Sequence, residues 1–414
     1  MPNEIVLRSP TAEELPRFLA PLSVAFLEEF TDAAIENERR TIELDRSIGA
    51  FDGDHAVGFS GAYSFRLTVP GGEVGAAGVT AVGVLPSHRR RGILRQMMTW
   101  LFAQARERLE PVAILWASEA AIYQRFGYGP GTMSSAFEIP TGKVRFRRPT
   151  ETAGRMRIVG LDEAAEKFPP IYEVLRRSTP GFLSRTDARW RWDVLFDAEW
   201  YRRGEGAKIL ALYEIDGHPR GYVIYRTKSD WDSTGPKGVV IVLELTALDP
   251  AAEQALWEWV SGIDLIATVR GRRGPLPHPL QLLLTEPRRL ALTVGDGSWL
   301  RIIDLPDALA GRSYASSGEL VLEVTDEFCP GNAGRWRLAA PAGRIASGAV
   351  VVPAGDVAPD LALDISDVAA VYLGAFRFAD LWRAGRVNEV RPGAVAEADT
   401  LFRTNGAPLT TTMF

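Results

Sequence analysis

The sequence predicts a mixed α/β (α+β) fold in which one strand-and-helix arrangement occurs twice and is followed by a separate α+β segment. The first segment alternates strand and helix patterns around a central apolar strand, and the middle segment repeats that order. Short strands, the first at 299–305, and then helices form the last segment. At roughly 150 residues per domain, a chain of 414 residues holds about three domains. We expect these domains at residues 1–150, 151–295 and 296–414.

The first segment predicts a strand and then a helix that begins at a capping box, Thr11 with Glu14. Apolar residues at helical spacing form the expected inner face of that helix, namely Leu15, Phe18, Leu22 and Phe26. The remaining strands and helices alternate, with strands at 56–67, 78–85 and 112–117 and helices at 92–108 and 120–125. Glycines at positions 71, 72, 75 and 78 predict a loose connection before the strand at 78–85.

The middle segment matches the first at a nearly constant offset. The hairpin turn at 216–218 repeats the turn at 52–54, and Pro250 follows a strand as Pro86 does, in both cases 164 positions later. These matches predict an internal structural duplication. The second copy is acidic at 249–253, where the first copy has a basic loop. We therefore expect the first copy alone to bind an anionic ligand.

Composition excludes several classes of protein. Hydrophobic residues make up 46% and charged residues 24%, as in ordinary globular proteins. No apolar stretch approaches the roughly 18–20 residues that cross a membrane, and the first residues do not have the pattern of a secretory signal. The single cysteine, Cys329, cannot form an internal disulfide, which agrees with a reducing compartment. We expect a cytoplasmic protein that has no membrane partner.

The charge balance disfavours a general nucleic-acid-binding protein. The chain has 47 basic and 52 acidic residues and a net charge of −5, whereas phosphate contacts require a basic face. A cationic small substrate suits this balance better. The four histidines stand far apart, without a second ligand at metal-binding spacing, at His55, His88, His218 and His278. We expect no nucleic-acid partner and no metal ion.

The most informative stretch runs from Val82 to Leu94. An apolar strand ends there, three arginines and a glycine turn the chain, and an amphipathic helix begins. A helix start leaves backbone N–H groups without partners and carries a partial positive charge. Gly92 lets a ligand approach the backbone, and the neighbouring arginines add charge-assisted bonds to phosphate oxygens. The stretch predicts a pyrophosphate cradle, with a basic surface turn as the alternative.

These residues resemble the signature of the GNAT superfamily of acetyl-CoA-dependent N-acetyltransferases, a strand followed by Gln/Arg-x-x-Gly-x-Gly/Ala and a helix. The last position departs from that signature, since Leu94 replaces the small residue. That departure, the duplicated layout and the stretches at 118–123 and 125–129 resemble one branch, the Eis-type (enhanced intracellular survival) aminoglycoside N-acetyltransferases. The resemblance implies tandem GNAT folds, each a mixed central sheet flanked by helices, of which the second is degenerate. It also implies a sterol-carrier-protein-like α+β domain after them.

The resemblance further implies which residues bind acetyl-CoA. Val82 and Val84 are expected to offer backbone groups to the pantetheine arm, and Ser118 to lie near it. The residues expected to hold the pyrophosphate are Arg89, Arg90, Gly92, Ile93 and Leu94. Tyr123 is expected near the sulfur, where a phenol of pKa roughly 10 suits protonation of a departing thiolate. Tyr128 is the nearest competitor and is expected to be structural.

The end of the chain carries no charged side chain from Thr404 to Phe414. Such a tail can be buried, although most termini fray in solvent. In the family that this sequence resembles, the carboxylate of a terminal phenylalanine serves as the general base, and Phe414 fits that description. A free α-carboxyl group has a pKa of roughly 3.5, so burial or a relaying water must assist it.

Together, the residues and the resemblance predict an acetyl-CoA-dependent N-acetyltransferase that acts on polycationic acceptors such as aminoglycosides, at one or several amines per molecule. Such acceptors require an acidic and partly aromatic pocket, for which Phe26, Glu28 and Glu29 are the candidates. The resemblance also implies a homo-hexamer. Two alternatives stay open. One is a lysine or peptide N-acetyltransferase that uses the same site, and the other is a non-catalytic protein that binds a lipid or another ligand through its C-terminal domain.

Overall fold

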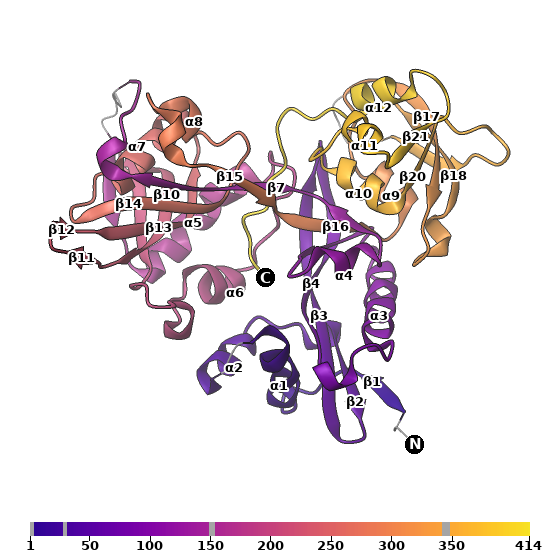
Figure 1. Ribbon diagram of the computed structural model, residues 1–414, viewed down its shortest axis with the longest axis horizontal. Coiled ribbons are helices and arrows are strands. Elements are labelled where there is room, and N and C mark those ends of the chain that lie inside the picture. The colour runs from indigo at the N-terminus through magenta and orange to yellow at the C-terminus, as the bar shows by residue number, and fades with distance from the viewer. Residues whose placement is uncertain (1–3, 28–30, 149–153, 342–347) are drawn as a thin grey trace. The chain divides into compact units, whose positions relative to one another are not determined.

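The structure is a computed structural model that describes residues 4–27, 31–148, 154–341 and 348–414 (Figure 1). The chain forms two compact units. The first comprises Met1–Thr132, Ser298–Pro408 and Thr412–Phe414, and the second comprises Met133–Gly297 and Leu409–Thr411. The division into three domains at residues 150 and 295 stays a prediction. Among the helices of the described ranges, none has the length and apolar character needed to cross a bilayer.

A seven-stranded sheet forms the centre of the first unit. In order across the sheet, its strands are β1 (Ile5–Arg8), β2 (Ser47–Asp52), β3 (His55–Val69), β4 (Gly72–Val84), β5 (Val112–Trp116), β16 (Ser298–Ile302) and β6 (Tyr128–Pro130). All neighbours are antiparallel except β4 and β5, between which α3 (Ile93–Glu107) carries the chain back. Two parallel strands that follow one another in the chain need such a crossover, so α3 accounts for the parallel pairing of β4 and β5.

The expectation of a loose glycine connection is wrong. The chain turns at 70–71, and Gly75 and Gly78 lie inside β4, where they pair with Arg66 and Tyr63 of β3. A Cβ atom on Gly78 would overlap the ring of Phe65. Glycine at this position therefore makes room for an aromatic side chain that lies over the strand.

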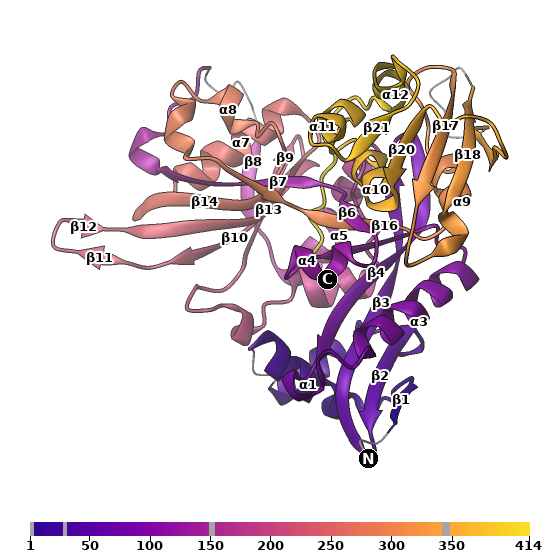
Figure 2. The same ribbon diagram turned by 45° about the vertical axis from the view of Figure 1, so that its right-hand side comes forward.

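Two helices cover opposite faces of this sheet (Figure 2). Phe18 of α1 (Leu15–Phe26) packs against Phe51, whereas the neighbouring Ala50 packs against Met97 of α3. Since successive side chains of a strand point to opposite faces, α1 and α3 lie on different sides. Two shorter helices complete this part of the unit, α2 (Asp32–Glu38) and α4 (Ala120–Gln124).

The predicted inner face of α1 is confirmed for Leu15, Phe18 and Leu22, which are buried, and is wrong for Phe26, which is 39% exposed. The last turn meets β4 through other side chains. A Cβ on Gly83 would lie 2.7 Å from Cδ2 of Leu22 and 3.2 Å from Cβ of Ala25. The contacting face thus continues to Ala25, which points Phe26 away from the sheet.

The rest of the first unit is a five-stranded sheet with helices. The strands, in order, are β19 (Val350–Pro353), β18 (Gly334–Ala340), β17 (Gly318–Thr325), β20 (Leu361–Asp364) and β21 (Val387–Glu389), and the helices are α9 (Leu305–Ala310), α10 (Ile365–Tyr372), α11 (Phe378–Arg383) and α12 (Ala394–Phe402). A buried ion pair joins it to the first sheet, since Arg301 of β16 donates to Asp326 at 2.7 Å. The strand expected at 299–305 therefore belongs to the first sheet, where Leu300 pairs with Ile114 and Gly129.

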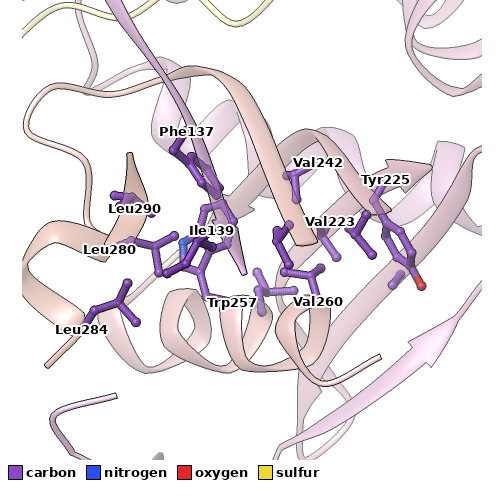
Figure 3. Packing of buried hydrophobic residues seen from close by; sticks show 14 of the residues in the cluster. Phe137, Ile139, Val223, Tyr225, Val242, Trp257, Val260, Leu280, Leu284 and Leu290 are labelled. Carbon is purple, nitrogen blue, oxygen red and sulfur yellow. The ribbon is translucent and has the colours of Figure 1, made fainter. Parts of the chain in front are cut away.

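The second unit is built on another seven-stranded sheet. Across it run β8 (Arg155–Ile158), β9 (Ile209–Ile215), β10 (His218–Lys228), β13 (Gly238–Ala247), β14 (Ile266–Gly274), β7 (Met133–Pro140) and β15 (Thr293–Asp296). The other elements are α5 (Leu161–Arg176), α6 (Asp187–Arg189), α7 (Pro250–Ser261), α8 (Leu280–Leu283), β11 (Trp231–Asp232) and β12 (Gly235–Pro236). Figure 3 shows part of its core, in which Trp257 and Val260 of α7 pack with Phe137 and Ile139 of β7.

The predicted duplication is confirmed by the strand orders. In both sheets the fourth and fifth strands are parallel and a helix connects them, α3 in the first sheet and α7 in the second. The sixth position is exchanged between the two halves of the sequence. Strand β7 follows β6 in the chain but lies in the second sheet, and β16 follows β15 but lies in the first.

Candidate active site

The loop between β4 and α3 has the backbone shape of an anion site. Arg90 and Gly92 both have positive φ angles, 64° and 78°, a conformation that turns successive N–H groups toward one side. For Arg90 this conformation costs about 1–2 kcal/mol, and such strain gathers at functional sites. Gly92 caps α3 without a side chain, and a Cβ atom there would meet nothing within 4 Å. The first turn of α3 is therefore open to a ligand.

One carboxylate organises this loop. Oδ2 of Asp52, at the end of β2, lies 3.1 Å from Nε2 of His88 and 3.2 Å from Nη1 of Arg91. In the part of the chain that the structure describes, the exposed Arg89 and Arg90 have no side-chain partner. Two guanidinium groups thus remain for an anion. In the sequence, Asp52 is visible only as a turn residue, and no local pattern reveals its long-range contacts.

Strand β4 has an open edge beyond Gly78. It pairs with β5 only from Ala76 to Gly78, and from there to Val84 its partner within the described ranges is β3 alone. A bulge bends this stretch, since Ala81 has a φ of 52° and the register shifts beside it. Leu85 donates its N–H to Val57 of β3. By alternation, the N–H groups of Val84 and Val82 point to the open edge.

Helix α4 places Tyr123 beside the core of the first unit. Its side chain is 6% exposed and packs edge-on against Tyr128, with ring centroids 5.8 Å apart. Burial raises the pKa of Tyr123 to about 12, and a hydrogen bond with Ser118 partly offsets that rise. Tyr123 is therefore un-ionised at neutral pH and has its proton available for donation.

Tyr128 lies deeper than Tyr123. It is fully buried, and burial raises its pKa well above the ordinary range. Within the described residues its hydroxyl group finds no hydrogen-bond partner. Because Gly127 and Gly129 before and after it pack closely on Arg301 and Ser366, its position is set by the interior of the unit. This environment agrees with the structural role expected for Tyr128.

The end of the chain is docked on the same sheet. The ring of Phe414 packs edge-on against Phe65 of β3 at a centroid distance of 5.0 Å, and its Cε2 would lie 3.2 Å from a Cβ on Gly78. Nε1 of Trp116, the last residue of β5, donates to the backbone oxygen of Thr412 at 3.0 Å. The tail therefore ends where β4 and β5 stop pairing. The uncharged tail is visible in the sequence, whereas the residues on which it docks carry no local signal.

The remaining predicted residues differ in their surroundings. Ile93 is buried and Leu94 is partly buried in the core, so at these positions only backbone groups could meet a ligand. Phe26 is partly exposed at the end of α1. Glu28 and Glu29 lie outside the described residues.

The residues that are present fit the parts of acetyl-CoA. The open first turn of α3 and the exposed guanidinium groups of Arg89 and Arg90 suit a pyrophosphate, and the edge of β4 beyond Gly78 suits the amide groups of a pantetheine arm. For a metal ion the described residues offer no group of three or more His, Cys, Asp or Glu side chains.

Comparison with known proteins gives the same architecture. An acetyltransferase (GNAT) domain matches residues 6–131, another matches residues 181–302, and a sterol carrier protein domain matches residues 305–411. The chain is 42% identical over 370 residues to an uncharacterized N-acetyltransferase of Streptomyces avermitilis, which covers 88% of each chain. It is 33% identical over 415 residues to the N-acetyltransferase Eis of Mycobacterium tuberculosis, which covers 96% of each chain.

A solved structure has the same fold over the whole chain. The crystal structure of Eis1 from Mycobacterium abscessus superposes with a TM-score of 0.84 at 32% identity and covers 100% of both chains. GNAT domains use acetyl-CoA, so the chain is an acetyl-CoA-dependent N-acetyltransferase. Its tandem GNAT folds and sterol-carrier-protein-like domain are those predicted from the sequence. The chain belongs to the family of Eis-type GNAT N-acetyltransferases.

Proposed function

We propose that the enzyme acetylates amines of polycationic, aminoglycoside-like acceptors, with Tyr123 as general acid and the C-terminal carboxylate of Phe414 as general base. One observation carries the proposal. The last residue of the chain is docked against Phe65 and Gly78 at the point where β4 and β5 separate. A terminus without a role would be expected to fray, and this one is ordered at the open edge of β4.

Acetyl-CoA supplies the acetyl group as a thioester. In the proposed arrangement, the loop at Arg89 and Arg90 holds the pyrophosphate and the edge at Val82 and Val84 holds the pantetheine arm. Backbone N–H groups at Gly92, Ile93 and Leu94 complete the cradle. Holding the thioester in this way converts the attack of a bound amine into an intramolecular step.

The proton transfers then balance. The carboxylate of Phe414, directly or through a water, takes a proton from the acceptor ammonium, and the amine nitrogen forms a bond to the thioester carbon. As the carbon–sulfur bond breaks, the hydroxyl of Tyr123 gives its proton to the sulfur and receives in its place the second proton that the nitrogen loses. The carboxyl group of Phe414 then releases its proton to solvent. An alkyl thiol has a pKa of about 8.5, below the value of about 12 for Tyr123. A thiolate of that pKa would not leave a tyrosinate behind, so we expect the phenol to regain a proton in the same step in which it donates one.

The acceptor is expected to bind near the end of α1, with Phe26, Glu28 and Glu29 as the contacting residues. Their aromatic and acidic side chains suit a molecule that carries several ammonium groups. An assembly of six copies and a cytoplasmic location also stay predictions. Sedimentation of the purified chain would test the first, and fractionation of cells would test the second.

The decisive experiment compares two changes at the end of the chain. Incubation with acetyl-CoA and a panel of aminoglycosides, polyamines and lysine peptides is followed by thiol release and by product mass. A single serine added after Phe414 moves the carboxylate and keeps the ring, and it is expected to abolish turnover. The matched control, Phe414→Leu, keeps a terminal carboxylate but loses the ring pair with Phe65, and it is expected to retain turnover that is lowered about fivefold.

Acetyl-CoA binding, measured by calorimetry, should be unchanged in both variants. Unchanged turnover in the extended chain would remove the carboxylate from the mechanism. Turnover of lysine peptides in preference to aminoglycosides would overturn the proposed acceptor class while leaving acetyl transfer in place.

A further inference from the structure

The second unit contains a buried polar cluster to which acetyl transfer assigns no task. The side chain of Arg185 is 1% exposed and donates to both oxygens of Glu244, at 2.9 and 2.7 Å. Tyr222 donates to the same carboxylate at 2.5 Å, and the guanidinium lies 3.9 Å from the ring centre of Tyr172. Desolvating such a pair costs several kcal/mol, so an apolar core would serve stability equally well.

Residues near the end of the chain lie against this cluster. The N–H of Leu409 donates to the carbonyl of Pro180 at 2.9 Å, and the hydroxyl of Thr410 donates to the carbonyl of Gly181 at 2.9 Å. Nη2 of Arg185 lies 3.5 Å from the hydroxyl oxygen of Thr411. All these contacts are within the second unit.

The side chains of the same segment are buried. Leu409 is 9% exposed and packs in a hydrophobic core of the second unit beside Phe182 and Trp190, and Thr410 is 1% exposed. A segment that merely passed over the surface would not bury an apolar side chain and a satisfied hydroxyl.

Gly181 shows that the backbone is shaped for this contact. It has a φ of 95°, which favours glycine, and an added Cβ would lie 2.7 Å from the carbonyl oxygen of Leu409 and 3.0 Å from its nitrogen. The close approach of the two backbones therefore requires glycine at this position.

We infer that Pro180, Gly181 and Arg185 form an anchor for residues Leu409–Thr411 of the C-terminal tail, and that turnover depends on this anchor. This inference rests on the proposed role of Phe414. Three residues of extended chain span at most about 10 Å, so fixing Thr411 confines Phe414 to a small volume. Ordering a chain terminus costs conformational entropy, and the contacts at Leu409–Thr411 offset part of that cost.

The test uses the full-length enzyme and two substitutions, one in the tail and one in the segment that the tail contacts. Thr410→Val removes one buried hydrogen bond at constant size, and Gly181→Ala introduces the clash with Leu409. The matched control is Thr400→Val, because Thr400 is exposed and its hydroxyl donates to the carbonyl of Ala396 in the same helix. The first readout is the rate at which carboxypeptidase releases Phe414. A buried hydrogen bond is worth about 1 kcal/mol, so we expect Thr410→Val to speed release about fivefold.

The second readout is kinetic. Both anchor variants are expected to lower kcat while the KM for acetyl-CoA stays unchanged, and Thr400→Val is expected to change neither. In a chain that lacks Phe414, Gly181→Ala should cause no further loss of kcat, because the carboxylate that it misplaces is already gone. A purely structural role would instead lower kcat additively.

The two hypotheses fail in different ways. Release of Phe414 at the wild-type rate in both anchor variants would overturn the anchor. Faster release, together with full turnover in the chain that lacks Phe414, would keep the anchor as a tail-binding site and overturn its role in catalysis.

Discussion

The ring of Phe414 meets that of Phe65 edge-on, with centroids 5.0 Å apart and planes inclined by 63°. The last residue of the chain and a residue of β3 are thereby joined, although they lie 349 positions apart in the sequence. Gly78 lies beneath both rings and leaves the space that they occupy. This contact is the part of the candidate site that depends most on tertiary structure.

The substitution Phe65→Leu should therefore lower kcat, and it should do so more than a substitution that removes a similar ring pair away from the tail. An edge-on aromatic pair contributes about 0.5–1.5 kcal/mol, so loss of the pair should cost about fivefold in the docked population of Phe414. Turnover at saturating acetyl-CoA measures the effect. The control is Phe51→Leu, which removes a similar edge-on pair with Phe18 and lies away from the tail. Equal kcat values in the two variants would contradict the prediction.

Tyr123→Phe is expected to reduce kcat by about 10²–10⁴-fold, the usual contribution of a general acid, while acetyl-CoA still binds. Because burial raises the pKa of Tyr123 to about 12, the phenol keeps its proton through mildly alkaline pH. The wild-type rate should accordingly not decline between pH 8 and about pH 10. Initial rates across that range check this, and a fall in kcat centred near pH 9 would assign the acid to another group.

Asp52→Asn should weaken binding of acetyl-CoA without changing kcat. The carboxylate holds His88 and Arg91 in the loop that leads to α3, and a partly exposed ion pair contributes up to about 1 kcal/mol. We expect the KM for acetyl-CoA to rise about fivefold and the KM for acetyl-pantetheine, which has no pyrophosphate, to stay constant. Asp54→Asn, in the same hairpin turn and exposed, is the matched control. Equal rises for both donors would show that Asp52 does not act through the pyrophosphate loop.

The second unit should lose stability in mild acid through His278. Its side chain is 2% exposed between Phe137 and Trp257, and burial lowers its pKa to about 4. The unfolded chain binds the proton more tightly, with a pKa of about 6.5, so stability is lost as the pH falls from about 6.5 to about 4. Over that window the loss approaches about 3 kcal/mol.

Urea unfolding at pH 7 and pH 4.5 measures this loss. His278→Asn can still accept the N–H of Leu280 and should show a smaller difference between the two pH values. His218→Asn changes an exposed histidine of the same unit and should behave as the wild type. A wild-type response in His278→Asn would place the acid sensitivity elsewhere.

Local patterns were enough to predict much of the first sheet and its helices. The strand, basic turn and helix from Val82 onward are encoded within about a dozen residues, because glycine, arginine and apolar periodicity act on their immediate neighbours. The inner face of α1 was predicted to within one residue position, and Phe26 failed because the contact with β4 passes through Ala25 instead. The tandem folds could be predicted because a hairpin turn and a proline of the first copy each recur 164 positions later.

By itself, the sequence determined the duplicated layout and the basic loop of the first copy, since periodicity and motif spacing are local properties, and its resemblance to a known family indicated an acetyltransferase. Only the tertiary structure decided that β7 and β16 exchange sheets, that Asp52 holds the loop and that Gly181 receives Leu409. These relationships join residues far apart in the chain. They depend on which edges and side chains meet after folding, and no local pattern records the identity of a distant partner.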